Sequence, residues 1–213
     1  VISDFMGSGM SYSAIFTPLE PGPKDFKLAA GSFVDAAGND NEIISFSSTY
    51  VPPIGSEYGG GVIAYIFTPH DLGYVEGEVH GLIAAKIDQS TLSGASWYNG
   101  AFIKTDAIGA AIGEGRENTD LIVSKQGRVF NETFSAARLC ADYVVTEDNV
   151  VYDDWFLPSK DELNKLFINK EMIGNFEVDG YWSSTEEDKE EAWRQSFYNG
   201  YQNYGNKRSE GIE

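Results

Sequence analysis

Apolar residues recur along this chain at the spacings of short strands and helices. Residues 62–67 are dense in β-branched and aromatic side chains, and residues 81–85 form a second apolar run, so both segments predict strands. Small apolar residues share one face within residues 133–145, which predicts an amphipathic helix. Another helix is predicted over residues 118–123, with Asn118 as its cap.

A third helix is predicted from its start signal. Ser159 and Glu162 have the spacing of a capping box, in which the Ser hydroxyl accepts the Glu162 amide and the Glu carboxylate accepts the Ser159 amide. Apolar Leu163, Leu166 and Phe167 follow. Glu162 is therefore assigned a structural role, since a general acid there would need a partner carboxylate that the spacing does not reveal.

The first fifty residues have the pattern of short strands separated by turns. Strands are predicted over residues 12–18, 25–28 and 43–47. The Tyr-x-Ala-x-Phe-Thr-Pro strand and the later Asp-Ala-Ala-Gly-Asn turn resemble the C-terminal half of a bacterial Ig-like module. Because a full sandwich needs about seven strands, residues 1–50 are expected to form a partial Ig-like β segment. The loop at residues 35–41 offers oxygens for calcium but lacks the EF-hand spacing, and it is interpreted mainly as a turn.

A pair of prolines marks the end of this segment. Pro52 and Pro53 cannot sustain a strand ladder and favour a stiff, extended path, so residues 51–58 are predicted to be a linker. Residues 59–213 are then expected to form a second, ligand-binding domain. The three glycines at its start lack the Lys-Ser/Thr of a phosphate loop, so they predict close backbone packing in place of nucleotide binding.

The C-terminal run has the composition of a binding surface. Residues 192–206 are rich in Tyr, Asn, Ser, Gly, Trp and Arg, which binding loops favour. Alternation places Trp193 and Phe197 on one face, as expected buried anchors, and Arg194 and Ser196 on the other, open to a partner. An ordinary strand and Asn-Gly turn would give the same pattern. The predicted ligand-binding side chains are Arg194, Ser196, Tyr198, Tyr201, Asn203, Tyr204, Asn206 and Arg208.

Four ordered segments of the chain resemble the Lcl C-terminal domain family. They are residues 77–85, 136–140, 154–164, which begin Asp-Trp-Phe-Leu-Pro-Ser, and the run from residue 180 to the end. The resemblance implies an α+β, C-type lectin-like fold of the formylglycine-generating-enzyme-like subtype, preceded by the partial all-β Ig-like segment. Members usually close with a strand resembling Val-Arg-Ala-Val-Arg, which is not found here, so that strand is expected to be clipped or missing from the sequence.

The charge of the chain changes which partners are expected. Binding to phosphate backbones relies on clusters of Lys and Arg, so a net charge of -18 argues against nucleic acid and disfavours anionic membranes. No apolar run approaches about eighteen residues, and no signal-peptide pattern opens the chain, so neither membrane insertion nor a leader is expected. A hydrophobic content of 42% predicts a packed core. The acidic stretch at residues 186–191 is interpreted as a solvated surface connector.

Candidate catalytic and metal-binding residues are few. Cys140 is the single cysteine, which excludes an internal disulfide and a thiolate zinc cluster. Its apolar helical face predicts a small buried side chain, not a reactive thiol. His70 and His80 lie far apart without a His-Glu-x-x-His pattern, and so make a poor zinc site. No catalytic residue, metal site or cofactor is predicted, and the chain is not expected to be an enzyme.

These features favour a ligand-binding protein of the receptor-recognition or adhesin type, with a surface protein or a glycan as its partner. The family resemblance implies an extracellular location, on a cell surface or a virion. Some family members are variable proteins of diversity-generating retroelements, and adenine-directed mutagenesis of Asn-type codons would leave a similar tail. Two alternatives are a structural stalk or tip of a surface fibre or phage tail, and a formylglycine-generating-type oxidase. The oxidase is disfavoured because the related enzymes depend on cysteines.

Overall fold

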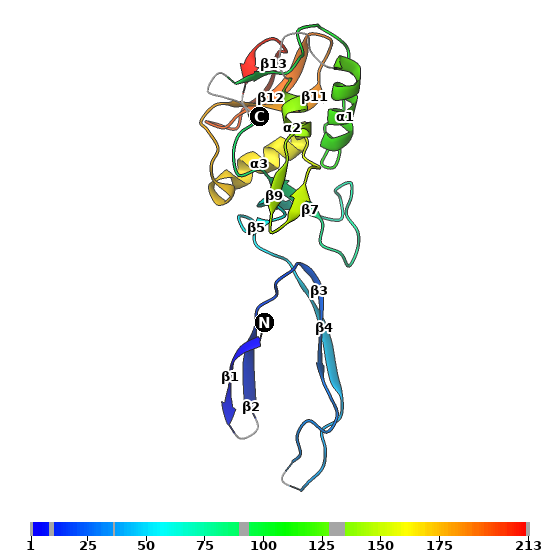
Figure 1. The fold of residues 1–213 in the computed structure, drawn as a ribbon, viewed down its shortest axis with the longest axis vertical. Coiled ribbons are helices and arrows are strands. Elements are labelled where there is room, and N and C mark those ends of the chain that lie inside the picture. Colours follow the sequence, from blue (N-terminus) through cyan, green and yellow to red (C-terminus); the bar gives the residue numbers. More distant parts are fainter. Residues whose placement is uncertain (1, 9–10, 36, 90–93, 128–134, 212–213) are drawn as a thin grey trace. The chain divides into compact units, whose positions relative to one another are not determined.

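The computed structural model of the chain describes residues 2–8, 11–35, 37–89, 94–127 and 135–211 (Figure 1). The chain divides into two compact units. The first comprises Val1–Pro52 with Val75–Val79, and the second comprises Pro53–Tyr74 with His80–Glu213. The main division falls between the two adjacent prolines, which cannot continue a strand ladder.

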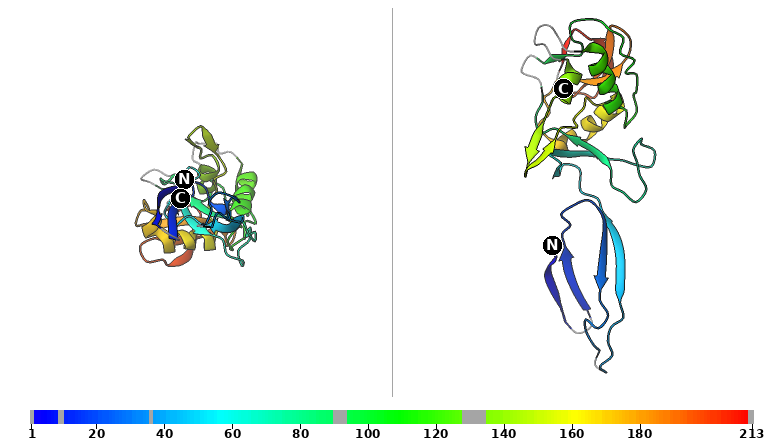
Figure 2. Two further views of the ribbon diagram at one scale, coloured as in Figure 1. Left: turned by 90° about the horizontal axis from the view of Figure 1, so that it is seen from below. Right: turned by 45° about the vertical axis from the view of Figure 1, so that its right-hand side comes forward.

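The first unit consists of antiparallel hairpins. Its strands are β1 (Ile2–Ser8), β2 (Ser11–Phe16), β3 (Gly22–Leu28) and β4 (Ile44–Tyr50). β1 pairs with β2, and β3 pairs with β4 along its whole length, as the side-by-side strands in Figure 2 show. The strands expected from the sequence are confirmed as β2, β3 and β4, and β1 is an addition to them.

These hairpins leave much of their apolar surface exposed. Phe26 packs edge-on against Phe16 and stacks on Phe46, with ring centroids 4.6 Å apart in each pair. Phe46 is nevertheless 61% exposed and Ile44 is 54% exposed. The expected part of an Ig-like sandwich is therefore replaced by two-stranded ribbons, because so few strands cannot cover both sides of a core.

The loop between β3 and β4 is a hydrogen-bonded turn, as its composition predicts. The Asp35 carboxylate accepts the backbone N–H groups of Ala37 and Asn39 at 2.8 and 2.9 Å, and the Asn39 side-chain amide at 2.9 Å. The bond from the Asn39 side chain, together with the backbone bonds, holds the pKa of Asp35 below its ordinary value. The carboxylate thus organises its own turn.

The described residues of the second unit contain small antiparallel sheets, of which β5–β6–β7 and β11–β12–β13 have three strands and β9–β10 and β8–β14 have two. The strands are β5 (Glu57–Tyr58), β6 (Gly61–Ile66), β7 (Gly81–Ala84), β8 (Ala95–Ser96), β9 (Val145–Glu147), β10 (Val150–Tyr152), β11 (Gly180–Glu186), β12 (Glu191–Ser196), β13 (Gln202–Asn206) and β14 (Glu210–Gly211). β6 and β7 confirm the two strands predicted from apolar runs.

Close packing explains the glycine at the start of β6. A Cβ atom on Gly61 would lie 2.4 Å from the carbonyl oxygen of Ala84 and 2.9 Å from the Trp155 ring. A side chain at this position would force β6 away from β7, so the prediction of close backbone packing is confirmed.

The helices of the described chain are α1 (Gly115–Gln126), α2 (Ala136–Ala141) and α3 (Lys160–Ile173). α3 begins with the predicted capping box: the Ser159 hydroxyl accepts the Glu162 N–H, and the Glu162 carboxylate accepts the Ser159 N–H at 2.7 Å. The start of α3 is therefore set by residues adjacent in sequence, as expected.

The other two helices differ from the prediction. α1 begins at Gly115, so Asn118 lies within the helix and does not cap it. The buried Asn118 side chain instead forms two hydrogen bonds with the backbone of Gly109: it donates to the carbonyl and accepts from the N–H. α2 ends at Ala141, since β9 begins at Val145, and the predicted start at residue 133 lies outside the described residues.

The buried side chains of the second unit form three clusters. The first includes Trp97, Ile122 and Trp182, and the third joins Tyr181 to Leu163 and Phe197. The second packs β6 and β7 against Ile173 of α3. Because neighbouring residues of a strand point to opposite faces, Trp182 and Tyr181 bury the two faces of β11 in different clusters. β11 is thus buried on both of its faces.

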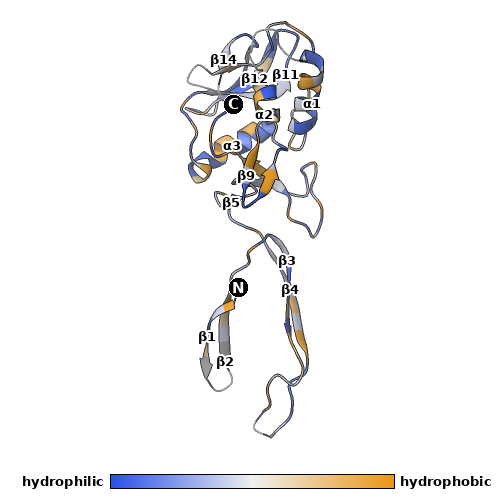
Figure 3. Ribbon diagram, viewed as in Figure 1, coloured by the Kyte–Doolittle hydropathy of each residue, from blue (hydrophilic) through white to orange (hydrophobic). Residues whose placement is uncertain are grey.

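The β9–β10 hairpin presents apolar side chains outside these clusters. It is coloured hydrophobic in Figure 3, and its residues Val150 and Val151 are 49% and 57% exposed. This hairpin therefore contributes to the surface of the unit more than to its core.

The expected C-type lectin-like α+β fold is wrong. The described strands form only separate antiparallel sheets of two or three strands, with three helices. None of these sheets joins β5–β7 to β11–β13. The resemblance rests on short segments, which fix turns and helix caps locally, whereas the pairing of distant strands depends on contacts that those segments do not encode.

Candidate functional site

The C-terminal sheet β11–β12–β13 carries most of the predicted binding side chains. Arg194 of β12 lies opposite Trp182 of β11 and Asn203 of β13. Its neighbour Trp193 lies opposite Tyr204. Directly opposed residues share a face of an antiparallel sheet, so Arg194 and Asn203 are on one face and Trp193 and Tyr204 are on the other.

Buried aromatic side chains fix this sheet to the unit. The Trp182 ring is 1% exposed, and its Nε1–H donates to the Ala95 carbonyl at 3.0 Å. Phe197 is 1% exposed, with its ring centroid 4.4 Å from that of Tyr181. The predicted burial of Phe197 is confirmed. Trp193, the other expected anchor, is only half-buried, and the anchoring role belongs to Trp182.

The tip of the β12–β13 hairpin exposes two tyrosines. Tyr198 is 76% exposed and Tyr201 is 66% exposed. The turn between them is closed by the Gly200 N–H, which donates to the Ser196 carbonyl at 2.8 Å. Gly200 has a φ of 79°, and a Cβ atom on it would lie 2.4 Å from the Phe167 ring. The tip is thus packed on α3 while its tyrosine rings face solvent.

A third tyrosine lies on the sheet beside Trp193. Tyr204 is 49% exposed, and its ring stands edge-on to Trp193 at a centroid distance of 5.6 Å. Lys160 places its Nζ atom 3.6 Å from the centre of the Trp193 ring, and the Trp193 Nε1–H donates to Glu187 at 2.8 Å. Trp193 is therefore held by a cation–π contact and a hydrogen bond, and it supports Tyr204.

The remaining predicted side chains are distributed over different surroundings. Arg194, Ser196 and Asn203 are half-buried, and the Arg194 guanidinium lies 5.9 Å from the Trp182 ring. Asn206 and Arg208 are exposed. The Arg208 side chain donates from Nε to the Tyr98 hydroxyl at 3.2 Å, which ties it to a different segment.

The structure therefore does not gather all the predicted side chains on one face. The exposed members within the hairpin are Tyr198, Tyr201, Tyr204 and Asn206, while the half-buried Arg194 and Asn203 lie on the sheet face opposite to Tyr204. The expectation that the Arg194 face is open is wrong, because Trp182 brings that face into the first cluster. On the Trp193 face, Gln195 and Phe197 are buried and Trp193 is half-buried.

The interpretation of residues 186–191 as a solvated connector is wrong for Glu186. The side chains of Glu186 and Lys207 are both 0% exposed, and their Oε1 and Nζ atoms are 2.6 Å apart. The Glu186 carboxylate also accepts the backbone N–H groups of Thr105 and Asp106. Residues 187–190 are exposed, as expected. A buried ion pair therefore ties the end of β11 to the segment after β13.

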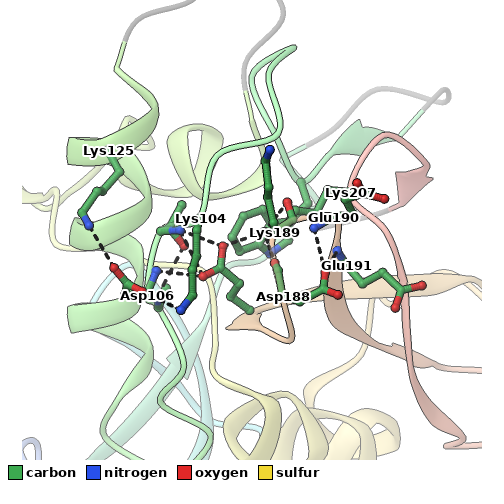
Figure 4. A network of polar contacts seen from close by, with 12 residues as sticks. Lys104, Asp106, Lys125, Asp188, Lys189, Glu190, Glu191 and Lys207 are labelled. Atoms are coloured by element: carbon green, nitrogen blue, oxygen red, sulfur yellow. Dashed lines mark hydrogen bonds and ion pairs between the residues drawn. The ribbon is translucent and has the colours of Figure 1, made fainter.

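Lys207 is central to the network in Figure 4. Its ammonium donates to the Asp188 carbonyl at 2.6 Å and lies 4.3 Å from the centre of the Trp97 ring. Burial lowers the pKa of Lys207, and Glu186 opposes that shift. Asp106 extends the network outward, because its carboxylate pairs with Lys104 at 3.2 Å and with Lys125 at 3.1 Å. No local sequence signal indicates that these charges meet.

Glu162 lies under the N-terminus of α3 and is fully buried. Its carboxylate accepts the Ser159 N–H at 2.7 Å and the Gly113 N–H at 2.8 Å. Burial raises the pKa of this carboxyl above its ordinary value, against the effect of these backbone bonds. Its oxygens hold two segments of the chain together, which agrees with the structural role assigned from the sequence.

Two further observations bear on partners. Among the described residues, no group of three or more His, Cys, Asp or Glu side chains is arranged to hold a metal ion. The helices of the described chain are also too short or too polar to span a membrane. Comparison with known proteins found no matching family model, no matching curated protein and no matching solved structure, so the resemblance to the Lcl C-terminal domain family stays a prediction.

Proposed function

We propose that this chain is a binding protein that recognises a surface protein or a glycan through the C-terminal hairpin. The observation that carries this proposal is the exposure of Tyr198, Tyr201 and Tyr204, at 76%, 66% and 49%, in a hairpin where Phe197 is 1% exposed. A tyrosine ring offers a large apolar area and a hydroxyl for hydrogen bonding. One short hairpin therefore carries three such exposed rings.

The rigidity of the hairpin supports the same function. Trp182 and Phe197 are each 1% exposed and hold the sheet from inside. Gly200 packs the tip against Phe167 of α3. A surface that is already ordered loses less conformational entropy when a partner binds, so a larger part of the contact energy appears as affinity.

The charge of the chain restricts the partner. A net charge of -18 repels polyanions over the range of the Debye length, so sulfated or phosphorylated polymers are poor candidates. Neutral glycans, which stack on tyrosine rings, and protein surfaces with basic or neutral patches are better suited. We place this recognition outside the cell, on a cell surface or a virion, as the family resemblance implies.

Diversification of the tail by a retroelement is part of the proposal and has its own test. Asn and Tyr are concentrated at residues 198–206, within the hairpin. If adenine-directed mutagenesis produced this composition, the coding DNA will be followed by a near-identical repeat that differs at adenines, close to a reverse transcriptase gene. Without that repeat, the binding surface is fixed in sequence and the binding proposal is unaffected.

The decisive experiment is a screen of glycan and surface-protein arrays with the unmodified chain and with Tyr198, Tyr201 and Tyr204 all changed to Ala. Loss of binding by at least about tenfold is expected, because exposed aromatic anchors carry most of the energy of an interface. The matched control changes Ile108, Ile168 and Val178 to Ala, since these side chains are 67%, 61% and 69% exposed outside the hairpin.

Thermal unfolding separates a lost contact from a lost fold. The tyrosine variant and the control should unfold near the temperature of the unmodified chain, because all the altered side chains are largely exposed. Equal binding by the tyrosine variant and the unmodified chain would refute the assignment of the binding surface to this hairpin.

A further inference from the structure

A separate cavity of about 320 Å³ lies within the second unit. It is bounded by β7 and the segment after it, by the first half of α3, and by residues 152–158. Its volume falls at the lower end of the range of about 300–1,000 Å³ that is typical of small-molecule sites. Ile87, one of the lining residues, is 62% exposed. None of the hairpin tyrosines lines it, so its ligand is independent of the function proposed above.

Aromatic rings form much of the cavity wall. Trp155 meets Tyr143 edge-on at a centroid distance of 5.4 Å, and Phe176 meets Tyr181 edge-on at 5.7 Å. The Trp155 Nε1–H is satisfied by the Tyr152 carbonyl at 3.1 Å, which holds the indole in place. Ring faces carry partial negative charge, so a wall of this kind attracts a cation.

The charged residues that line the cavity have one sign. The described lining residues include Asp88, Asp154 and Glu162 and no Lys, Arg or His. Glu162 is committed to backbone N–H groups. Asp154 is 83% exposed in its side chain and lies 3.6 Å from Arg116. Asp88 is therefore the carboxylate that remains for a ligand in the cavity.

Asp88 has capacity for a further donor. Its oxygens accept the Tyr181 hydroxyl at 3.0 and 3.1 Å, and that hydroxyl in turn accepts the Glu177 N–H at 2.8 Å. A carboxylate has about four acceptor positions, and the hydrogen bonds of the described residues give Asp88 this single neutral donor. The negative charge of the half-buried Asp88 carboxylate is thus incompletely compensated, and a positively charged ligand would supply the missing compensation.

We propose that this cavity is a binding site for a small organic cation, namely an amine or a quaternary ammonium with an aromatic or aliphatic body. The apolar body would fill the space between β7 and α3, and the positive group would lie beside Asp88 and the aromatic wall. The acidity of the whole chain, with a net charge of -18, also raises the local concentration of cations.

The test measures the affinity of phenethylamine, phenethyl alcohol and phenylacetate by calorimetry on the intact chain. These probes share a phenyl group and differ in charge. The amine should bind at least about tenfold more tightly than the alcohol, because charge pairing and the cation–π contact both favour it. Phenylacetate should bind most weakly. Benzyltrimethylammonium distinguishes charge from hydrogen bonding, since it carries the charge without an N–H donor, and it should bind more tightly than the alcohol.

Asp88→Asn provides the second arm, and it should remove most of the preference for the amine. The matched control is Asp153→Asn, which should leave the preference unchanged because Asp153 is exposed and does not line the cavity. Replacing the three hairpin tyrosines should also leave amine binding unchanged, so the two proposals fail independently.

Three outcomes would overturn the proposal: no binding of the amine at millimolar concentration, equal or tighter binding of the alcohol or phenylacetate, or an unchanged amine preference in a folded Asp88→Asn variant. The comparison among probes uses the unmodified chain, so it decides the matter even if the Asp88→Asn variant does not fold.

Discussion

Replacing Lys207 with Met tests whether the buried ion pair holds the C-terminal sheet. Both side chains of the pair are 0% exposed, and Nζ lies 2.6 Å from Glu186 Oε1. The substitution preserves most of the side-chain volume and removes the positive charge. Glu186 would then be a buried carboxylate whose compensation comes from the N–H groups of Thr105 and Asp106.

The expected cost follows from this environment. Removing one partner of a buried pair costs about 3–5 kcal/mol, because the other charge is left uncompensated. The two backbone donors keep part of the stabilisation of Glu186, so we expect about 3 kcal/mol. For a domain of 150–250 residues, each kcal/mol lowers the unfolding temperature by about 2–4 °C, which gives a decrease of roughly 6–12 °C.

The assay is calorimetric and urea unfolding of Lys207→Met, Glu186→Gln and the double variant. The double variant should recover much of the loss, because two neutral side chains leave no buried charge. The matched control is Lys104→Met, whose side chain is 65% exposed beside Asp106 and should leave the unfolding midpoint nearly unchanged.

The Glu186→Gln variant adds a dependence on pH. Burial lowers the pKa of Lys207, and Glu186 opposes that effect, so without Glu186 the folded-state pKa falls further below the unfolded value. Between the two pKa values the unfolded chain binds more protons, so the stability of this variant should rise as pH rises through that window.

A loss below about 1 kcal/mol for Lys207→Met would refute the reasoning, since the mean effect of any point substitution is that large.

Three further predictions concern Gly200, Asp88 and Cys140. Gly200→Ala should lower the free energy of unfolding by about 1–3 kcal/mol, because φ is 79° and the new methyl would meet Phe167 at 2.4 Å. Urea unfolding measures this change. The control is Gly180→Ala, which should change the stability little because no atom lies within 4 Å of the added methyl. Burial raises the pKa of Asp88 above its ordinary value, and the hydrogen bond from the Tyr181 hydroxyl partly offsets this. Tyr181→Phe should therefore raise the pKa of Asp88 further, as measured by NMR titration. A fall in that pKa would contradict the assigned hydrogen bond. Cys140 is 7% exposed, so its thiol should be alkylated far more slowly in the folded chain than in urea, and rapid labelling of the folded chain would reopen the enzymatic alternative.

Features that depend on neighbouring residues could be predicted from the sequence. Ser159 and Glu162 form the expected capping box because both partners lie within one helical turn. β6 and β7 follow from their apolar runs, and the Asp35 turn follows from its Asp, Gly and Asn residues. The burial of Cys140 follows in the same way from the helical spacing of its small neighbours.

Features that depend on distant residues required the tertiary structure. Glu186 and Lys207 are charged side chains in a polar tail, and nothing local indicates that both are buried against each other. Asn118 is a residue type that favours helix caps, but it becomes an interior residue whose side-chain amide donates to the Ser184 hydroxyl at 3.2 Å as well as to Gly109. In each case a partner that is remote in sequence replaces the local preference.

The candidate site divides in the same way. The sequence by itself determined that the C-terminal run is rich in tyrosine and turns at Asn199-Gly200, because composition and turn propensity are local properties. Only the tertiary structure decided that Tyr204 shares the face of Trp193, that Trp182 closes the face of Arg194, and that Asp88 meets Tyr181 at an aromatic cavity. The physical reason is that strand pairing and burial are set by contacts between segments far apart in the chain, and no short stretch of sequence specifies its partner.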